Sequence, residues 1–400
     1  MKHLLKLRYL LPLFFLSLVL LSCDDNEGAK PKVLVEATPI LTRTASELQT
    51  FLNAAGIDVV AGSLKYDVEI YRVTYKTEYK DDEVMASGLV ILPKTSESID
   101  MISFQHGTIV DYDEAPSALP LNSSQLILYS ALASPGFVAV VPDFIGFGSS
   151  KDILHPYYVK EATTTAVLDA LRAARELASK NGKNFNGELF LAGYSQGGYA
   201  TMAAHQAIET AGLEGFELIA SFPAAGGYDV KGMQEYFFDQ ETYDQPFYLA
   251  YVAMSYKSYY GWDGLLSDFF NEPYATRIPP LFNGTNSGGQ INAQLTTTVS
   301  DLVKADLLAQ IDNDPKYNYL VDAFNENSLL DWTPTVPMFM YHGDADVTVP
   351  YVNSVTSYEA LINGGASPNI VKLISLPGAD HSTGVIPYIE DFVPKVLSLK

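Results

Sequence analysis

Short apolar runs recur along the chain, between segments rich in polar residues, glycine and proline. Runs of this length, bounded by turn-forming residues, predict buried strands. The runs are Met101–Gln105, Phe137–Asp143, Glu188–Ala192, Glu217–Phe222, Val336–Tyr341 and Ile370–Leu376. Residues Tyr66–Tyr79 alternate instead between apolar and polar positions, and Val84–Leu92 follows after a turn. These two segments predict an antiparallel hairpin at an edge of the sheet.

The segment from Tyr228 to Leu330 shows no such strand pattern. Fourteen of the 39 residues from Tyr236 to Tyr274 are aromatic. Because this segment lies between two predicted strands, we expect it to form a helical cap above the carboxyl ends of the strands. Its rings would line an acyl pocket, stack on a ring of the substrate, or pack the small core of the cap itself.

One buried strand leads directly into Gly193-Tyr194-Ser195-Gln196-Gly197, and small, helix-compatible residues follow. A serine on so sharp a strand-to-helix turn is held in a strained conformation with its hydroxyl exposed above the sheet edge. The flanking glycines let the strand and the helix pack closely. The pattern predicts that Ser195 is a nucleophile, provided that an acid and a histidine accompany it.

Both partners follow later in the chain, each just after a predicted strand. The spacing H-G-x-x-D-x-x-V-P, which begins at His342, favours Asp346 as the acid over Asp344. His381 follows the last predicted strand and suits a general base. The other histidines lie in the leader, in turns, on a helix or in a loop rich in proline and tyrosine. Serine, acid and histidine thus occur in the order expected of a hydrolytic triad on an α/β fold.

A triad also needs donors for the negatively charged oxygen of its intermediate. We expect the first to be the backbone N–H of Gln196, at the start of the helix after the nucleophile. The second is expected from Thr108, in the loop after an early central strand, where Gly107 allows a close approach. The alternative is that His106-Gly107 is only a turn at a strand end.

These motifs, together with Pro142–Gly148, resemble the α/β-hydrolase superfamily over about 300 residues. Tyr-Ser-Gln-Gly-Gly and the long insertion before the acid strand resemble its secreted microbial lipase and esterase branch. Tyr-Ser-x-Gly-Gly also occurs in the prolyl oligopeptidase group, but too few residues precede Met101 for the propeller domain of that group. The resemblance implies an α/β-hydrolase fold: an eight-stranded, mostly parallel sheet flanked by helices, with a helical cap. It also implies ester hydrolysis through an acyl-enzyme, without a cofactor or metal.

The N-terminus has the pattern of an export signal. Lys2, Lys6 and Arg8 precede the apolar stretch Tyr9–Leu21, which is too short to span a bilayer as a mature helix. Leu20-Leu21-Ser22-Cys23 fits a bacterial lipobox, in which Cys23 is lipidated. This predicts an exported lipoprotein of the outer membrane or cell surface, anchored in the membrane through its N-terminal lipid. The alternative is an ordinary signal peptide with an incidental cysteine.

The expected organisation follows from these observations. It comprises a signal peptide over residues 1–22, a flexible tether over 23–35, a hydrolase core over 36–227 and 331–400, and a cap over 228–330. The formal net charge of −22 argues against nucleic acid as a partner, because phosphates would be repelled.

Hydrolysis of short or medium acyl esters is the favoured function. A carbohydrate or feruloyl esterase is the main alternative, because the aromatic residues of the cap would suit such substrates. A prolyl-type peptidase is disfavoured by the lack of a propeller. A non-catalytic surface binding protein on a hydrolase scaffold is disfavoured by the presence of Ser195, Asp346 and His381 together.

Overall fold

The computed structural model describes residues 32–400. The predicted signal peptide and Cys23 lie outside the described residues. The first strand, β1 (Leu34–Arg43), begins inside the predicted tether 23–35, so the tether boundary is too late. Leu34 is buried, and Val33 is held on both sides: its N–H donates to Glu176, and its carbonyl accepts from the Lys76 N–H. These contacts extend the sheet beyond the strands that the apolar pattern predicts.

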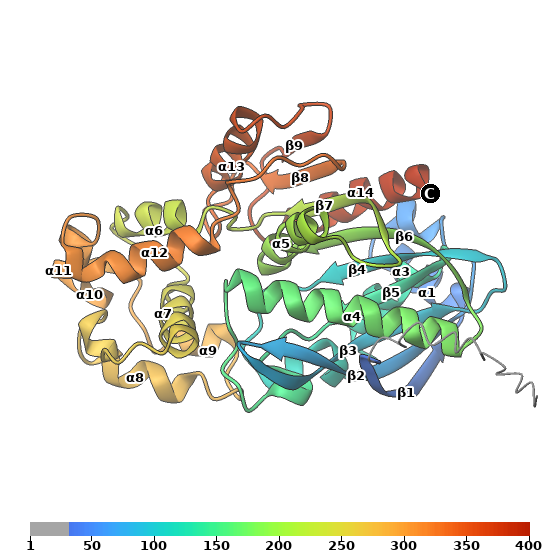
Figure 1. Cartoon of the computed structure of the whole chain (residues 1–400), viewed down its shortest axis with the longest axis horizontal. Helices are drawn as coiled ribbons and strands as arrows, with labels where there is room; N and C mark the ends of the chain where they lie inside the picture. Colours follow the sequence, from blue (N-terminus) through green and yellow to red (C-terminus); the bar gives the residue numbers. More distant parts are fainter. Residues whose placement is uncertain (1–31) are drawn as a thin grey trace, which may run out of the picture. The chain divides into compact units, whose positions relative to one another are not determined.

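A nine-stranded sheet runs through the described residues in the order β1-β2-β3-β5-β4-β6-β7-β8-β9 (Figure 1). β1, β2, β3 and β5 pair antiparallel, and the pairs from β5 through β4 to β9 are parallel. Besides β1, the strands are β2 (Val68–Tyr79), β3 (Asp82–Pro93), β4 (Ser98–Gln105), β5 (Phe137–Pro142), β6 (Asn184–Tyr194), β7 (Glu217–Ala224), β8 (Met338–Gly343) and β9 (Val371–Leu376). The sheet is therefore mostly parallel, with one strand more than the eight that the resemblance implies.

The burial of each strand explains its sequence pattern. All six residues of β5 are buried, because helices cover both faces of this central strand, so its sequence is a continuous apolar run. The predicted hairpin is formed by β2 and β3, but it does not lie at the edge of the sheet. β1 pairs with the outer side of β2 and takes that position.

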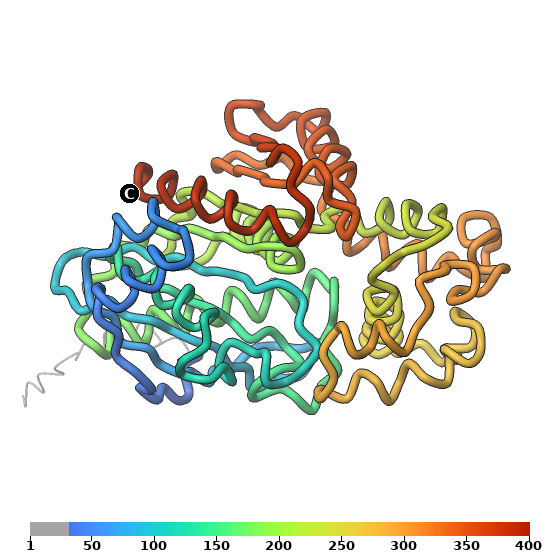
Figure 2. Tube along the Cα trace, turned by 180° about the vertical axis from the view of Figure 1, so that it is seen from behind, coloured from blue at the N-terminus to red at the C-terminus, as the bar shows by residue number. Residues whose placement is uncertain are grey.

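Two layers of helices sandwich the sheet. α4 and α5 pack on one face, and α1, α2, α3 and α14 pack on the other. Figure 2 shows α14 at the C-terminus beside the N-terminal α2, with which it is in contact. These helices and α13, which packs on β8 and β9, are α1 (Ala45–Ala54), α2 (Asp58–Ala61), α3 (Ser124–Ala133), α4 (Lys160–Lys180), α5 (Gln196–Ala211), α13 (Tyr351–Asn363) and α14 (Val385–Leu399).

The insertion between β7 and β8 is helical. Its helices gather beyond the carboxyl ends of the parallel strands, at the left in Figure 1. They are α6 (Val230–Phe238), α7 (Pro246–Tyr260), α8 (Tyr274–Leu281), α9 (Gly288–Asn292), α10 (Val299–Leu302), α11 (Ala305–Gln310) and α12 (Asn318–Asn327). We call residues 228–330 the cap. Most of its aromatic rings are buried or packed against the apolar cluster that joins it to the core.

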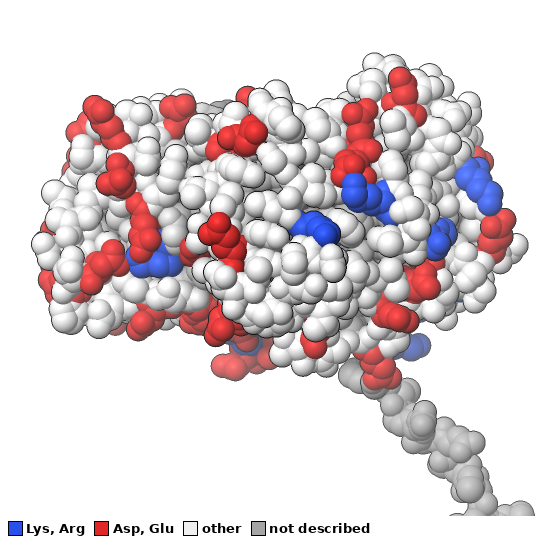
Figure 3. Space-filling view, turned by 90° about the horizontal axis from the view of Figure 1, so that it is seen from above, with Lys and Arg blue, Asp and Glu red and all other residues white. Residues whose placement is uncertain are grey.

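The surface carries many acidic side chains. Figure 3 shows them scattered over one face, with few lysines and arginines among them. Within residues 32–400 no helix is long and apolar enough to cross a membrane. The same residues contain no group of histidine, cysteine and carboxylate side chains arranged to hold a metal ion.

Candidate active site

Ser195 occupies the turn between β6 and α5. Its backbone angles, φ 61° and ψ −125°, lie in a region that residues with a side chain rarely adopt. The N–H of Ser195 donates to the carbonyl of Ala224 on β7 over 2.8 Å, which holds the turn in place. A side chain at Gly193 would overlap the carbonyl of Gly197. A side chain at Gly197 would in turn overlap the carbonyl of Gln105, so this turn requires both glycines.

Hydrogen bonds join Ser195, His381 and Asp346 in series. His381 Nε2 lies 2.9 Å from Ser195 Oγ, and His381 Nδ1 lies 2.6 Å from Asp346 Oδ2. Because an ionised carboxylate only accepts, Nδ1 carries the proton and Nε2 presents a lone pair to the serine hydroxyl. β6, β8 and β9 run parallel in the same sheet, so the loops after them meet at one edge. This topology brings together three residues that are distant in sequence.

The carboxylate of Asp346 is buried, and both of its oxygens accept hydrogen bonds. Asp346 Oδ1 accepts the N–H groups of Thr348 and Val349 over 2.9 and 3.0 Å. Oδ2 accepts from His381 and also faces His342 Nε2 at 3.2 Å. Burial raises the pKa of Asp346, but the hydrogen bonds from His342 and His381 outweigh it and lower the pKa to about 2. The carboxylate is therefore ionised at neutral pH.

His342 also belongs to the site, although its sequence context predicts only a residue in a turn. Its Nε2 also lies 2.9 Å from the carbonyl of Val349, so this nitrogen faces only acceptors and carries the proton. Its Nδ1 lies 2.6 Å from the hydroxyl of Ser354 on α13, which can donate to it. The signal that could have found it is the H-G-x-x-D spacing, which places His342 four residues before Asp346.

Two other aspartates near the site, Asp344 and Asp380, stabilise loops. Asp344 Oδ1 accepts the N–H of Gly378 over 2.6 Å, which ties together the loops after β8 and β9. Asp380 Oδ1 accepts the N–H groups of Ser382 and Thr383, and these bonds shape the turn around His381.

The two predicted oxyanion residues flank the nucleophile. Gln196 is the first residue of α5, directly after Ser195. A Cβ at Gly107 would lie 3.6 Å from the Cβ of Ser195, so the loop after β4 passes beside the serine. The side chains of Gln196 and Thr108 each form a hydrogen bond to the segment 155–157. The role of their backbone N–H groups as oxyanion donors stays a prediction.

Comparison with known proteins shows the fold shared with other hydrolases. A family model of secretory lipases matches residues 117–211, which contain the nucleophile turn. A crystal structure from Legionella pneumophila, described as that of a hydrolase, aligns with a TM-score of 0.83 at 26% identity. The alignment covers 92% of this chain and 98% of that one. The chain belongs to the α/β-hydrolase superfamily.

This α/β-hydrolase shares its fold with two further solved structures. The rice cell wall degrading esterase LipA from Xanthomonas oryzae is 23% identical, with a TM-score of 0.76 over 91% of this chain and 97% of that one. Candida antarctica lipase A in its closed state is 16% identical, with a TM-score of 0.65 over 88% and 78%. No curated protein sequence matches the chain. The predicted fold class and the resemblance to secreted lipases and esterases are confirmed.

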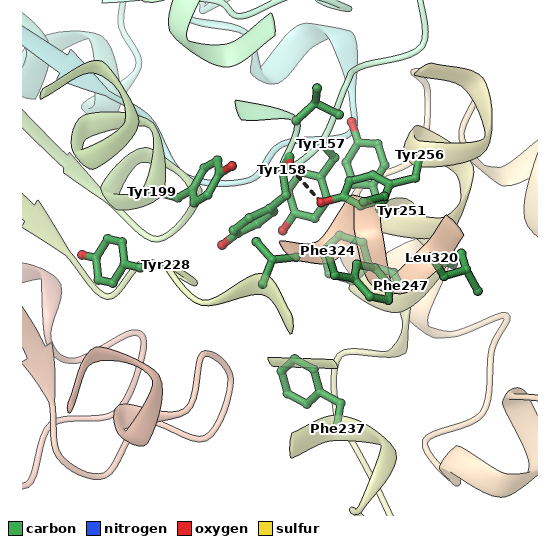
Figure 4. Packing of buried hydrophobic residues seen from close by; sticks show 14 of the residues in the cluster. Tyr157, Tyr158, Tyr199, Tyr228, Phe237, Phe247, Tyr251, Tyr256, Leu320 and Phe324 are labelled. Carbon is green, nitrogen blue, oxygen red and sulfur yellow. Dashed lines mark hydrogen bonds between the residues drawn. The ribbon is translucent and has the colours of Figure 1, made fainter. Parts of the chain in front are cut away.

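An apolar pocket lined by Ser195 of this α/β-hydrolase extends into the interior of the cap. Its wall holds no charged side chain and is built mainly by α6, α7 and α12, with Leu307 and Ile311 from the region of α11. Several cap rings line it, including Phe237, Tyr248 and Tyr256. Others, such as Phe247, belong to the buried cluster that packs the cap (Figure 4). The aromatic residues of the cap thus both line a pocket and pack the core of the cap.

Proposed function

We propose that this α/β-hydrolase cleaves carboxylic esters through an acyl-enzyme formed on Ser195. The observation that carries the proposal is the continuous series of hydrogen bonds from Asp346 through His381 to Ser195, beside an apolar pocket. The match of residues 117–211 to secretory lipases supports an ester as the substrate.

In the first half-reaction, Ser195 Oγ bonds to the carbonyl carbon of the ester while its proton moves to His381 Nε2. The resulting oxyanion accepts hydrogen bonds from the backbone N–H groups of Gln196 and Thr108. The bond to the alcohol oxygen then breaks, and His381 delivers its proton to that oxygen. Asp346 remains ionised throughout and stabilises the imidazolium ring.

Water completes the cycle. His381 takes a proton from a water molecule, whose oxygen attacks the acyl carbon. The second tetrahedral intermediate collapses as the bond to Ser195 Oγ breaks and the serine recovers a proton from His381. The carboxylic acid leaves, and the free enzyme is restored.

The pocket indicates what kind of acyl group is bound. A charged or strongly hydrated chain would lose its water in this pocket without gaining matching hydrogen bonds. The net charge of −22 further favours neutral esters over anionic ones. We therefore expect apolar acyl chains of short to medium length. Acetylated or feruloylated glycans are the alternative substrates, given the fold shared with a cell wall degrading esterase.

The test is hydrolysis of p-nitrophenyl esters from acetate to palmitate by the wild type and Ser195→Ala. The substitution removes the attacking oxygen, so kcat is expected to fall by about 10³- to 10⁶-fold while the circular dichroism spectrum stays unchanged. Undiminished turnover by Ser195→Ala would rule out the acyl-enzyme. Turnover of glycan esters alone would select the alternative substrate class.

We further propose that the protein is exported and anchored through a lipid on Cys23, because Leu20-Leu21-Ser22-Cys23 fits a lipobox. The match to secretory lipases supports export. Growth of expressing cells with radiolabelled palmitate is expected to label the wild type and to leave Cys23→Ser unlabelled. Equal labelling of both, or of neither, would refute the anchor.

A further inference from the structure

A short loop before α4 contacts the side chains of both predicted oxyanion residues. His155 Nε2 lies 2.6 Å from Gln196 Nε2. The Tyr157 hydroxyl lies 2.9 Å from Thr108 Oγ1. Thr108 lies in the loop after β4 and Gln196 at the start of α5, yet both are held by rings that stand two positions apart in one segment.

The protonation of His155 is fixed by its surroundings. Its Nδ1 lies 2.6 Å from the carbonyl of Ile145 and therefore carries the proton, which leaves Nε2 to accept from the amide of Gln196. Burial lowers the pKa of His155 to about 4, so the ring is neutral at physiological pH. Phe144 and Phe147 pack against the ring at centroid distances of 6.1 and 5.0 Å and restrict its movement.

Gln196 has little else to hold its side chain. It is 1% exposed, and among the described residues its Oε1 is buried without a hydrogen-bond partner. A buried, half-satisfied amide costs free energy, so an apolar side chain would serve packing better at this position. Its amide is aligned by one bond, to His155. Fixing the side chain fixes the Cα of Gln196, and with it the direction of the backbone N–H beside Ser195.

A tyrosine of the cap contacts the rings of both His155 and Tyr157. Tyr251 on α7 stacks on Tyr157 at a centroid distance of 4.5 Å and an interplanar angle of 10°. It also packs on His155 at 5.7 Å. Figure 4 shows Tyr157 and Tyr251 side by side. The loop that carries His155 and Tyr157 therefore contacts Gln196 and Thr108 on one side and Tyr251 of the cap on the other.

We infer that His155 and Tyr157 are positioning residues for the oxyanion hole. They hold Gln196 and Thr108 so that both backbone N–H groups point to one place beside Ser195, and Tyr251 braces them from the cap. This role rests on the proposed ester hydrolysis. It differs from core filling because it predicts loss of transition-state stabilisation without loss of substrate binding.

The first experiment measures kcat and KM with p-nitrophenyl butyrate for the wild type, His155→Phe and Tyr157→Phe. A small displacement of an oxyanion donor can cost up to about 100-fold in rate, so we expect kcat to fall about 10- to 100-fold in His155→Phe. Tyr157→Phe loses one hydrogen bond and is expected to lose up to about 10-fold. KM stays within about 2-fold in both variants, because neither hydrogen bond reaches the ground-state ester.

The matched control is Tyr75→Phe, which removes a buried tyrosine hydroxyl that donates to the carbonyl of Ala166 over 3.0 Å, between β2 and α4. It is expected to leave kcat unchanged. Affinity for butylboronic acid, which forms a tetrahedral adduct on the serine, should weaken in the two loop variants by the same factor as kcat. A rise in KM alone, or an equal loss of kcat in Tyr75→Phe, would overturn the inference.

A double-mutant cycle tests the route through Gln196. If His155 acts through that side chain, His155→Phe in a Gln196→Met background loses little further activity. Independent losses that multiply would overturn the inference. His155→Gln keeps an acceptor near the amide and is expected to recover part of kcat; it also replaces His155→Phe if that variant does not fold. An active wild type with unaffected variants refutes the positioning role alone, whereas an inactive wild type overturns both this role and the proposed function.

Discussion

At the scale of single residues, one carboxylate oxygen has two histidine partners. Asp346 Oδ2 accepts from the base His381 and lies 3.2 Å from Nε2 of His342, which stands four residues earlier, near the end of β8. His342 and the N–H groups of Thr348 and Val349 fix the carboxylate, so His381 meets an acceptor that cannot rotate away. The carboxylate of Asp346, fixed in the loop after β8, therefore orients the base His381.

This arrangement ranks the two candidate acids. Asp346→Asn replaces the acceptor of His381 Nδ1 with an amide that can donate, which favours the wrong tautomer of the base. We expect kcat to fall by about 10⁴-fold. Asp344→Asn removes only a charge that braces the loop at Gly378, so kcat is expected to change by less than about 10-fold. Steady-state kinetics of both variants at pH 8 give the comparison, and the reverse ranking would exclude Asp346.

Sequence spacing predicts the residues of the triad because each stands at a strand end, where the topology of the sheet brings strand ends together. The contact between His155 and Gln196 has no such signal. It joins residues 41 positions apart through a loop whose path depends on packing against Phe144, Phe147 and the cap. The contact of His342 with Asp346 is partly predictable, because the spacing of four residues between them is the one sequence signal for it.

At the scale of elements, the buried strands are predictable and the peripheral ones are not. β5 is a continuous apolar run because both of its faces are covered. β1 pairs with β2 on one side only and buries Leu34 fully while most of its other residues stay exposed, so its sequence alternates too weakly to predict a strand. The cap consists mostly of short helices, so its sequence lacks the regular apolar periodicity on which the prediction of individual helices depends.

The cap helices set the size of the acyl pocket. Leu320 on α12 is 6% exposed and lines the pocket, so Leu320→Trp fills part of its volume. We expect kcat/KM for p-nitrophenyl octanoate to fall by about 10-fold or more, with acetate unchanged. Asp322→Trp, on an exposed position of the same helix, is the control and is expected to leave both substrates unaffected. Equal losses on acetate and octanoate would show that Leu320 does not contact the acyl chain.

At the scale of the whole molecule, several histidines are buried in a neutral state. Burial lowers the pKa values of His106, His155 and His205, and that of His155 falls to about 4. In the unfolded chain a histidine titrates near pH 6.5. Between these two values the unfolded chain binds a proton on His155 that the folded chain does not. The free energy of unfolding therefore decreases as the pH falls through this range.

For His155 alone the loss between pH 6.5 and pH 4 amounts to about 3 kcal/mol. Urea denaturation of the wild type and His155→Gln across this range gives the measurement. The variant cannot titrate at this position, so its stability is expected to fall less steeply with decreasing pH. Parallel curves for the two proteins would show that the folded His155 titrates as it does in the unfolded chain.

The order of strands along the chain also determines when activity arises during biosynthesis. Ser195 belongs to the centre of the sheet, whereas the acid and the base follow β8 and β9, which form one edge and come after the cap. A nascent chain therefore contains the nucleophile turn and the cap segment before it contains either partner. The proposed triad is therefore complete only after β8 and β9, the last two strands along the chain, have joined the sheet.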